Sequence, residues 1–316
     1  MQIIVAAKCD QNLQNRLQKR FPDVEFSFFS SLQEVGDEIK KAEVLVTYGK
    51  KLTEDLLNKA KKLRWLMILS AGLDHLPLDD IKKRNILLTN VRGIHKIPIG
   101  EFVLAFMLQY VKKFPFFHKE KVKKSWSRNV QVDELYGQTL LVVGAGAIGS
   151  HIAKLAKCFG MQTLGIKRTI SENENFDAIY PLAKLNELLP QADFVVSVLP
   201  STAETKNVFT KEQFSLMKTT SVFINVGRGD AVKEADLLEA LEERTIAHAY
   251  LDVFQEEPLP ESHPYWTCEH ITITPHITGV TEKYVERAMV IFEKNLQLYL
   301  QGREHMINVV DVERGY

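Results

Sequence analysis

The sequence is poor in cysteine, has no surplus of either charge and lacks long apolar runs. Its three cysteines are far apart and form no Cys-x-x-Cys pair, which argues against a disulfide framework and against a zinc site. Lys plus Arg and Asp plus Glu both number 40, so the overall charge favours neither nucleic acid nor an anionic membrane. No apolar run reaches the roughly 18 residues of a membrane span, and no basic leader precedes Ile3. These absences favour a cytoplasmic protein with a small-molecule partner and no bound metal.

Short apolar runs alternate with helical patterns along the whole chain, which at 316 residues is long enough for about two domains. The first series of runs covers residues 3–6, 24–29, 44–48, 66–69 and 86–89. The second series covers residues 139–143, 162–166, 194–199, 221–225, 247–251 and 271–274. Such alternation is typical of parallel sheets with helical crossovers. It predicts an α/β protein with two Rossmann-like, doubly wound domains.

Two long helical patterns, at residues 99–113 and 281–301, bracket the second series. The simplest packing returns the last helix to the first domain. We therefore expect a dinucleotide-binding domain at 99–279 and a discontinuous substrate domain made of 1–98 and 280–316. The active-site cleft is expected between them, where ligands commonly bind.

Residues 112–124 combine several lysines with Phe114, Phe116 and Phe117. One interpretation is a basic surface for an anion or RNA. The other is a solvated helix whose aromatic face packs on the core, and the neutral charge balance favours it.

The apolar run at 139–143 leads into a Gly-x-Gly-x-x-Gly turn. Gly144 suits the tight turn, Gly146 lets the backbone approach a pyrophosphate, and Gly149 allows close packing of helix on strand. Apolar residues then recur at helical spacing up to Gly160, which stands where a helix ends. The pattern predicts a dinucleotide site with its phosphates at the helix N-terminus. The alternative is a tight turn without a ligand.

The partner strand at 162–166 indicates which dinucleotide binds. An acidic residue about 20 positions after the glycine turn usually holds the ribose of NAD. Here the chain has Lys167, Arg168 and Thr169 instead. Two cations and a hydroxyl suit a 2′-phosphate through charge-assisted hydrogen bonds. NADP(H) is therefore favoured over NAD(H), the alternative being that these are plain exposed loop residues.

Three later segments, 225–229, 251–258 and 274–279, each follow a predicted strand. Loops beyond the carboxyl ends of parallel strands face the ligand, so Arg228, Glu257 and His276 can converge there. His276 is the candidate general acid because a histidine can carry a proton near neutral pH. Arg228 has paired donors for a carboxylate and a ketone oxygen. A methyltransferase with the same glycine turn would leave all three segments unexplained.

With the glycine turn, these segments resemble the D-isomer-specific 2-hydroxyacid dehydrogenases, and the likeness extends over essentially the whole chain through 70–74, 89–93 and 199–205. The resemblance implies hydride transfer between NAD(P)H and a small 2-keto or D-2-hydroxy acid, of the glyoxylate or hydroxypyruvate type, by a homodimer formed through the cofactor domains. The alternative is a dinucleotide-sensing, protein-binding homologue like the related corepressors.

The resemblance also assigns roles to single residues. Glu257 is the carboxylate that pairs with His276 and fixes its ring, and Asp252 faces the nicotinamide carboxamide. Backbone amides around Ala71 and Gly72 bind the substrate carboxylate, with Ser70 as a side-chain helper. Further dinucleotide contacts are implied at Ala147, Ile148, Leu199, Pro200, Thr205, Val226 and Gly227.

Three positions keep two interpretations each. Thr205 either touches a ribose or caps a helix that begins nearby. Arg92 and His95, at the presumed domain crossing, either reach the cleft or pack across the hinge.

Overall fold

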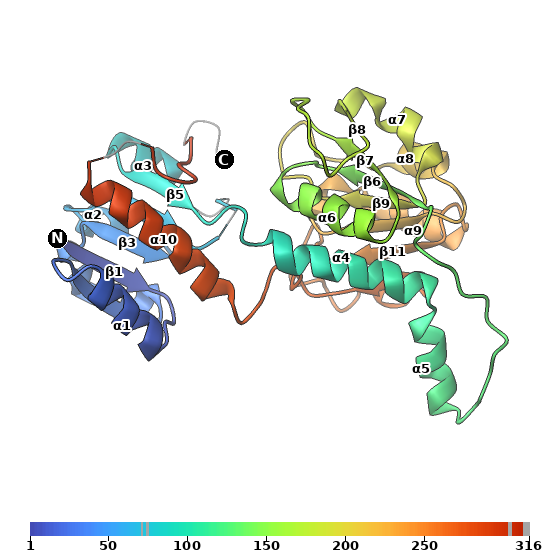
Figure 1. The fold of residues 1–316 in the computed structure, drawn as a ribbon, viewed down its shortest axis with the longest axis horizontal. Helices are drawn as coiled ribbons and strands as arrows, with labels where there is room; N and C mark the ends of the chain where they lie inside the picture. Colours follow the sequence, from blue (N-terminus) through green and yellow to red (C-terminus); the bar gives the residue numbers. More distant parts are fainter. Residues whose placement is uncertain (71, 74–75, 303–304, 312–316) are drawn as a thin grey trace. The chain divides into compact units, whose positions relative to one another are not determined.

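The computed structural model describes residues 1–316 except 71, 74–75, 303–304 and 312–316. It divides into two compact units (Figure 1). Unit 1 comprises Met1–Ile94 and Thr281–Tyr316, and unit 2 comprises His95–Val280. Each unit contains one parallel sheet with helices on both faces. The predicted α/β class with two doubly wound domains is therefore confirmed.

Unit 1 is built on a five-stranded sheet of order β2-β1-β3-β4-β5 within the described residues. Its strands are β1 (Gln2–Ala6), β2 (Glu25–Phe29), β3 (Val44–Thr47), β4 (Trp65–Ile68) and β5 (Leu87–Asn90). Its helices are α1 (Gln11–Arg20), α2 (Glu54–Lys59), α3 (Leu78–Lys83) and α10 (Tyr284–Leu300), with 3-10 turns η1 (Leu32–Glu34) and η2 (Gly36–Lys41).

The strands of unit 1 are buried on both faces because helices cover both sides of the sheet. Ile3 and Val5 of β1 point into a core completed by α1 and α10, whereas Ile4 and Ala6 point into a core completed by η1, η2, α2 and α3. Trp65 of β4 stacks on Phe292 of α10 with ring centroids 5.5 Å apart. The last helix is thus an integral layer of the unit that begins at the N-terminus.

Unit 2 is built on a seven-stranded sheet of order β12-β11-β10-β9-β6-β7-β8 within the described residues. Its strands are β6 (Thr139–Val143), β7 (Gln162–Ile166), β8 (Ala178–Tyr180), β9 (Phe194–Ser197), β10 (Val222–Asn225), β11 (His248–Leu251) and β12 (Ile271–Ile273). Its helices are α4 (Lys96–Val111), α5 (Phe114–Val122), α6 (Ala147–Cys158), α7 (Leu185–Leu188), α8 (Lys211–Leu216) and α9 (Glu234–Glu242). Four 3-10 turns complete it: η3 (Leu182–Lys184), η4 (Leu189–Gln191), η5 (Gly229–Ala231) and η6 (Pro264–Trp266).

Strand β6 marks the point where the strand order of unit 2 reverses. The chain runs outward from β6 to β7 and β8 on one side, and to β9, β10, β11 and β12 on the other. Helices α4 and α6 pack together over one face, and α7, α8 and α9 cover the other. In an open parallel sheet the carboxyl edge at such a reversal is where ligands bind. The fold therefore directs attention to the loops after β6, β7, β9, β10, β11 and β12.

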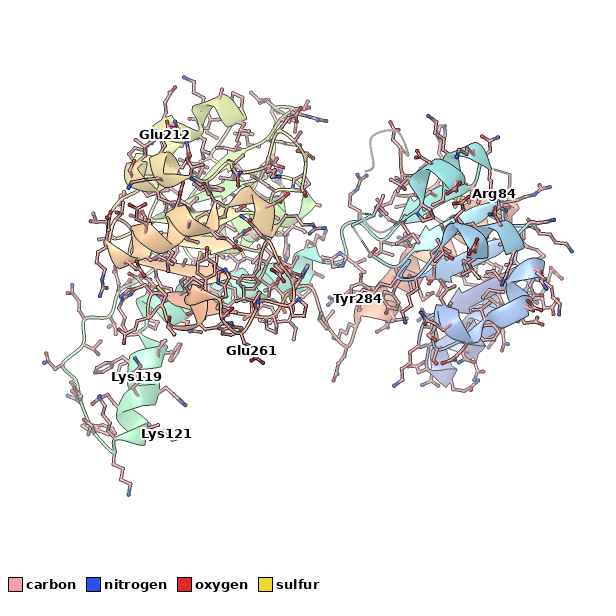
Figure 2. The ribbon with its side chains drawn as sticks, turned by 180° about the vertical axis from the view of Figure 1, so that it is seen from behind. Arg84, Lys119, Lys121, Glu212, Glu261 and Tyr284 are labelled. Atoms are coloured by element: carbon pink, nitrogen blue, oxygen red, sulfur yellow. The ribbon has the colours of Figure 1, made fainter. Side chains whose placement is uncertain are left out.

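Helix α5 and the segment after it form an arm, residues 112–132, that extends away from the sheet of unit 2 (Figures 1 and 2). The labelled side chains of Lys119 and Lys121 lie on this helix (Figure 2). No residue of α5 is buried, and Phe114 and Phe117 are 59% and 41% exposed. The expectation that the aromatic face of this helix packs on the core is therefore wrong, because the helix leaves the body of the unit.

No helix in the described parts of the chain combines the length and the apolar character that a membrane span requires.

Candidate functional site

The glycine turn joins the central strand β6 to helix α6, and each glycine has its own reason to lack a side chain. Gly144 adopts φ +111°, and a Cβ on it would lie 2.7 Å from the backbone oxygen of Val198. A Cβ on Gly149 would lie 2.3 Å from the oxygen of Gly144, so helix and strand touch directly. A Cβ on Gly146 would instead point into open space, with nothing within 4 Å. That open cradle at the start of α6 fits a dinucleotide pyrophosphate, which Ala147 and Ile148 would flank at the helix N-terminus.

The basic segment lies beside this turn because β7 is the neighbour of β6. Ile166, the last residue of β7, accepts hydrogen bonds from the backbone N–H groups of Gly144 and Ala145. Lys167 follows it, half-buried, and its Nζ donates to Ser171 Oγ at 3.0 Å. Arg168 and Thr169 are exposed. Positive charge thus stands next to the cradle.

The loops after β9 and β10 close the other side of the glycine turn. A Cβ on Gly227 would lie 2.7 Å from both the backbone nitrogen and the oxygen of Leu199, so the two loops are in contact. Val226 and Leu199 are buried, and Pro200 is exposed.

Thr205 closes a turn in the loop after β9. Its hydroxyl donates to Pro200 O at 2.6 Å and accepts from the backbone N–H of Thr202 at 2.9 Å. The next helix, α8, begins only at Lys211 and has Thr210 as its N-cap. The structure therefore gives Thr205 no helix to cap.

The Asn225 side chain, at the end of β10, holds the Arg228 loop. Sequence reasoning did not single out this residue. The Asn225 side chain, 1% exposed, accepts from Gly227 N–H at 3.2 Å and donates to Arg228 O at 3.0 Å. Both contacts close the turn on its own strand end, as asparagine side chains often do. The guanidinium of Arg228 is half-buried and donates to Gly227 O at 2.9 Å.

Glu257 and His276 form a pair at the ends of two adjacent strands. Glu257 Oε2 lies 2.6 Å from His276 Nδ1, and Oε1 accepts from the backbone N–H of Phe254 at 3.0 Å. Because a carboxylate only accepts hydrogen bonds, Nδ1 must carry a proton, which leaves Nε2 for chemistry. The His276 side chain is 51% exposed and that of Glu257 is 35% exposed, so Nε2 is open to a reactant.

The loop that carries His276 is anchored by Asp252. His276 adopts φ +50°, a conformation that non-glycine residues rarely take and that the surroundings must hold in place. Asp252, 1% exposed, accepts from Thr274 Oγ1 at 2.6 Å, Ile277 N–H at 2.9 Å and Thr278 Oγ1 at 2.6 Å. Both its carboxylate oxygens are therefore engaged in shaping this loop, beside any contact with the nicotinamide carboxamide.

The Arg228 and Glu257 loops also touch each other. A Cβ on Gly229 would lie 2.0 Å from the backbone carbon of Phe254, so only glycine fits there.

His95 lies nearby in the same unit. Its burial, and then the charge of Arg228, lowers its pKa to about 4. Its ring reaches within 3.2 Å of where a Cβ of Gly279 would stand. Unit 2 therefore gathers Arg228, Glu257 and His276, together with His95, at the carboxyl edge of its sheet.

The residues expected to bind the substrate carboxylate follow β4 of unit 1. Ser70 and Gly72 are half-buried, and Ser70 Oγ donates to Gly72 O at 2.8 Å. Ala71 lies outside the described residues. Arg92, after β5 in the same unit, is exposed, and its backbone N–H donates to Asn90 Oδ1 at 3.0 Å.

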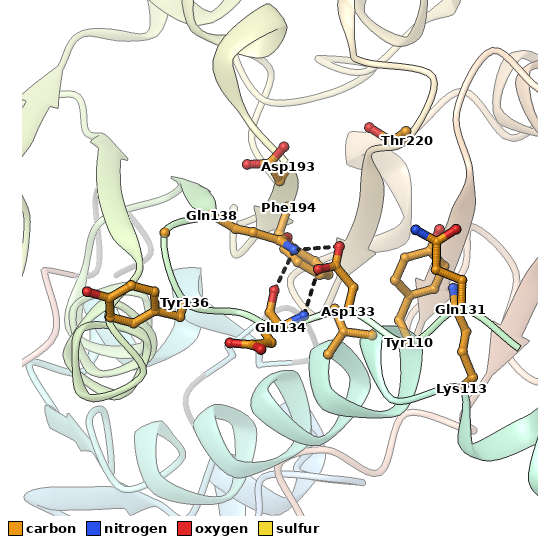
Figure 3. A pocket seen from close by; sticks show the side chains of 12 residues that line it. Tyr110, Lys113, Gln131, Asp133, Glu134, Tyr136, Gln138, Asp193, Phe194 and Thr220 are labelled. Carbon is orange, nitrogen blue, oxygen red and sulfur yellow. Dashed lines mark hydrogen bonds between the residues drawn. The ribbon is translucent and has the colours of Figure 1, made fainter. Parts of the chain in front are cut away.

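A cavity of about 660 Å³ lies elsewhere in unit 2, beside the arm (Figure 3). Gln138, Asp193 and Thr220, which line it, stand just before β6, β9 and β10. It therefore opens at the amino ends of these strands, opposite the edge that holds Arg228 and His276. Ligands of parallel sheets bind at the carboxyl edge, so this cavity is no part of the candidate site.

With this geometry established, comparison with known proteins identifies the family. The family model "D-isomer specific 2-hydroxyacid dehydrogenase, NAD binding domain" matches residues 104–278. The chain belongs to the D-isomer-specific 2-hydroxyacid dehydrogenase family.

Two curated relatives illustrate the similarity. Glyoxylate/hydroxypyruvate reductase B of Enterobacter sp. (strain 638) is 32% identical over 290 residues, which are 89% of each chain. D-3-phosphoglycerate dehydrogenase of Methanocaldococcus jannaschii is 32% identical over 298 residues. That match covers 92% of this chain but only 56% of the relative, so this chain spans about half of that relative's length.

Two solved structures share the fold over almost all of the chain. A D-isomer-specific 2-hydroxyacid dehydrogenase family protein from Aeromonas salmonicida superposes with TM-score 0.88 at 35% identity, covering 98% of this chain and 99% of that one. An NADPH-dependent glyoxylate/hydroxypyruvate reductase from Sinorhizobium meliloti, in complex with NADP and sulfate, gives TM-score 0.83 at 26% identity, covering 100% and 99%. The comparisons support an NAD(P)-dependent oxidoreductase that transfers a hydride to or from a small acid, and they do not favour the corepressor-like alternative.

Proposed function

We propose that this protein reduces a small 2-keto acid, of the glyoxylate or hydroxypyruvate type, with NADPH in preference to NADH. The observation that carries the proposal is the Glu257–His276 contact of 2.6 Å, at the sheet edge where the Glu257 loop meets the Arg228 loop. One edge of one sheet then carries a proton donor (His276), its carboxylate partner (Glu257) and a cation for an acid group (Arg228). The Enterobacter relative and the S. meliloti structure carry the name of this activity.

The proposed chemistry divides between the cofactor and the chain. A bound nicotinamide supplies the hydride for the ketone carbon. We propose that His276 Nε2 gives the proton to the ketone oxygen, while Glu257 keeps the ring oriented through Nδ1. Arg228 binds the substrate carboxylate with paired donors and aligns the ketone. Ser70, Ala71 and Gly72 of unit 1 are proposed as further substrate contacts.

The proposed cofactor contacts follow from the loops of unit 2. Gly144, Gly146, Ala147, Ile148 and Gly149 would hold the pyrophosphate at the start of α6. Lys167, Arg168 and Thr169 would hold the 2′-phosphate of NADP(H). Contacts along the rest of the dinucleotide are proposed for Leu199, Pro200, Thr205, Val226, Gly227 and Asp252.

The test measures activity on a panel of 2-keto acids with each cofactor. The readout is the fall in absorbance of the reduced nicotinamide. We expect glyoxylate or hydroxypyruvate to be reduced, with higher kcat/KM for NADPH than for NADH. His276→Ala should lower kcat by at least about a hundredfold, as expected for loss of a general acid, while cofactor affinity stays within about twofold. An unchanged kcat in this variant would refute the role of His276, and higher kcat/KM with NADH would refute the cofactor preference.

We also propose that the protein is a cytoplasmic homodimer joined through its cofactor units. Exposed aromatic side chains of unit 2 support the dimer, because Trp126 on the arm is 92% exposed and Tyr136, just after the arm, is 77% exposed. Aromatic side chains are enriched at protein interfaces. Light scattering after gel filtration should give a dimer for the wild type and a monomer for Trp126→Asp. Leu300→Asp, at a 49% exposed position on α10, is the control and should remain dimeric.

A further inference from the structure

The loop between β7 and β8, residues 167–177, carries the basic segment at its start and a polar cluster near its end. We call this group the Ser150 cluster; it consists of Ser150 on α6 with Asn173 and Asn175 on the loop. The amide nitrogens of Asn173 and Asn175 both donate to Ser150 Oγ, at 2.9 Å and 3.0 Å. All three residues are part-buried. One hydroxyl in the second turn of α6 thus gathers both asparagines of the loop.

Within the Ser150 cluster, Asn173 also shapes the loop itself. Asn173 Oδ1 accepts from the backbone N–H of Asn175 and from its side-chain amide, both at 3.1 Å. Thr163 Oγ1 on β7 donates to Asn175 O at 3.1 Å. The next residue, Phe176, is buried over Gly165, where a Cβ would lie 2.9 Å from its ring. The end of the loop is therefore tied to both the helix and the strand that flank the glycine turn.

At the start of the loop, Lys167 is held through both its backbone and its side chain. Lys167 N–H donates to Tyr180 O at 3.0 Å, and Lys167 Nζ donates to Ser171 Oγ at 3.0 Å. The segment 168–172 is exposed. Its position relative to α6 is therefore set by β7 before it and by the anchored residues after it.

We propose that the Ser150 cluster positions the basic segment 167–171 for a 2′-phosphate, and so sets how strongly the protein distinguishes NADP(H) from NAD(H). This inference rests on the proposed NADP(H) preference. Ordering a loop costs backbone conformational entropy. The cluster meets that cost during folding, so the loop does not have to be ordered when the cofactor arrives. Ser150, Asn173 and Asn175 are positioning residues, since they act through Lys167 and Arg168.

The test measures binding of half-cofactors by calorimetry, which needs no turnover. Adenosine 2′,5′-bisphosphate carries the 2′-phosphate, and adenosine 5′-monophosphate lacks it. We expect Ser150→Ala to weaken the bisphosphate about fivefold or more, a loss of the size that one or two hydrogen bonds provide, and the monophosphate less than twofold. Ser150→Thr keeps the hydroxyl and should restore the wild-type ratio.

Asn186→Ala is the matched control. Asn186 lies in the same unit and makes side-chain hydrogen bonds of the same kind, to Glu212 at 2.9 Å and from Gln213 at 3.1 Å, away from this loop. It should change neither probe. If Ser150→Ala fails to fold, Asn175→Ala replaces it. This variant removes one of the two amide donors to Ser150 Oγ, and it should fold because Asn173 still binds Ser150.

The outcomes separate this inference from the proposed function. Equal binding of the two probes by the wild type would refute the NADP(H) preference itself. If the wild type prefers the bisphosphate, and Lys167→Ala/Arg168→Ala abolishes that preference, the proposed function holds. Preservation of the preference in both Ser150→Ala and Asn175→Ala would then overturn the role of the Ser150 cluster.

Discussion

Adding one methyl group to Gly146 should separate cofactor binding from stability. Its backbone, at φ −84° and ψ −156°, is extended, and no heavy atom lies within 4 Å of the added Cβ. Alanine at such a position leaves the free energy of unfolding unchanged or raises it by up to about 1 kcal/mol. The methyl group would instead occupy the cradle where a phosphate approaches the backbone. Loss of one hydrogen bond to a charged group costs about 1.5–3 kcal/mol, so the Kd for NADPH should rise about ten- to a hundredfold.

Gly149→Ala, three residues later, should instead lower the stability of the fold. Its Cβ would lie 2.3 Å from the backbone oxygen of Gly144 and 2.8 Å from Val142 Cγ1. Because the first of these atoms is backbone, helix α6 must shift away from β6. Overpacking of this kind costs about 1–3 kcal/mol, partly offset by the roughly 1 kcal/mol helix preference of alanine. Because the 2.3 Å clash is with backbone, the cost lies at the upper end of this range, about 3 kcal/mol, and the expected net loss of unfolding free energy is about 2 kcal/mol.

Urea denaturation measures the stability of both variants, and titration calorimetry with NADPH and NADH measures their affinity. Gly146→Ala should be as stable as the wild type and bind both cofactors weakly. If it binds them as the wild type does, the assignment of the open cradle to the pyrophosphate is refuted. If Gly149→Ala is as stable as the wild type, the steric argument from the 2.3 Å approach is refuted.

Three further changes test other parts of unit 2. Glu257→Gln should lower kcat about a hundredfold through loss of the carboxylate that orients His276, with NADPH affinity by fluorescence within about twofold; an unchanged kcat would contradict this. Asp252→Ala should cost about 3 kcal/mol in urea denaturation because several donors lose their acceptor, and a loss below about 1 kcal/mol would count against its anchoring role. Burial, and then the charges of His270 and Lys113, lower the pKa of His248 from 6.5 to about 4. The unfolded chain therefore binds this proton more readily than the folded chain does, and stability is lost as the pH falls from about 6.5 towards 4. His248→Gln should therefore remove up to about 2 kcal/mol of the stability loss between pH 7 and pH 5. His118→Gln, at an exposed position, is the control. If His248→Gln and the wild type lose stability equally with pH, the argument is refuted.

The strands of both sheets were largely predictable because parallel strands buried on two faces read as short apolar runs. Their bounds differ from the predicted ones by a residue or two, as at β4, where Trp65 replaces Leu69 as a strand residue. Strand β8 was not predicted, since Ala178–Tyr180 is too short and only half-buried to give a pattern. The aromatic spacing of α5 indicated a helix, but spacing does not say which surface an apolar stripe meets.

In the candidate site, the residues that follow strands were predictable, whereas those that hold the loops were not. Arg228, Glu257 and His276 come after recognisable apolar runs. The contacts of Asn225 and Asp252 depend on backbone conformations such as φ +50° at His276, which no residue pattern indicates. An asparagine immediately before Val-Gly-Arg-Gly was the only sequence signal for the first of these.

The packing of Trp65 on Phe292 has a consequence for synthesis of the chain. Unit 2 is one continuous stretch, His95–Val280, whereas unit 1 needs α10, which is translated after all of unit 2. On the ribosome, unit 2 can fold as soon as it emerges, while one face of the sheet of unit 1 is only partly covered, by α1, until α10 appears. Closing that face joins residues more than two hundred positions apart, as in the hydrogen bond from Tyr284 to Leu69 O at 2.7 Å, and such long-range closure is slow. During this interval the nascent chain exposes an apolar sheet face, which makes unit 1 the part most dependent on chaperones.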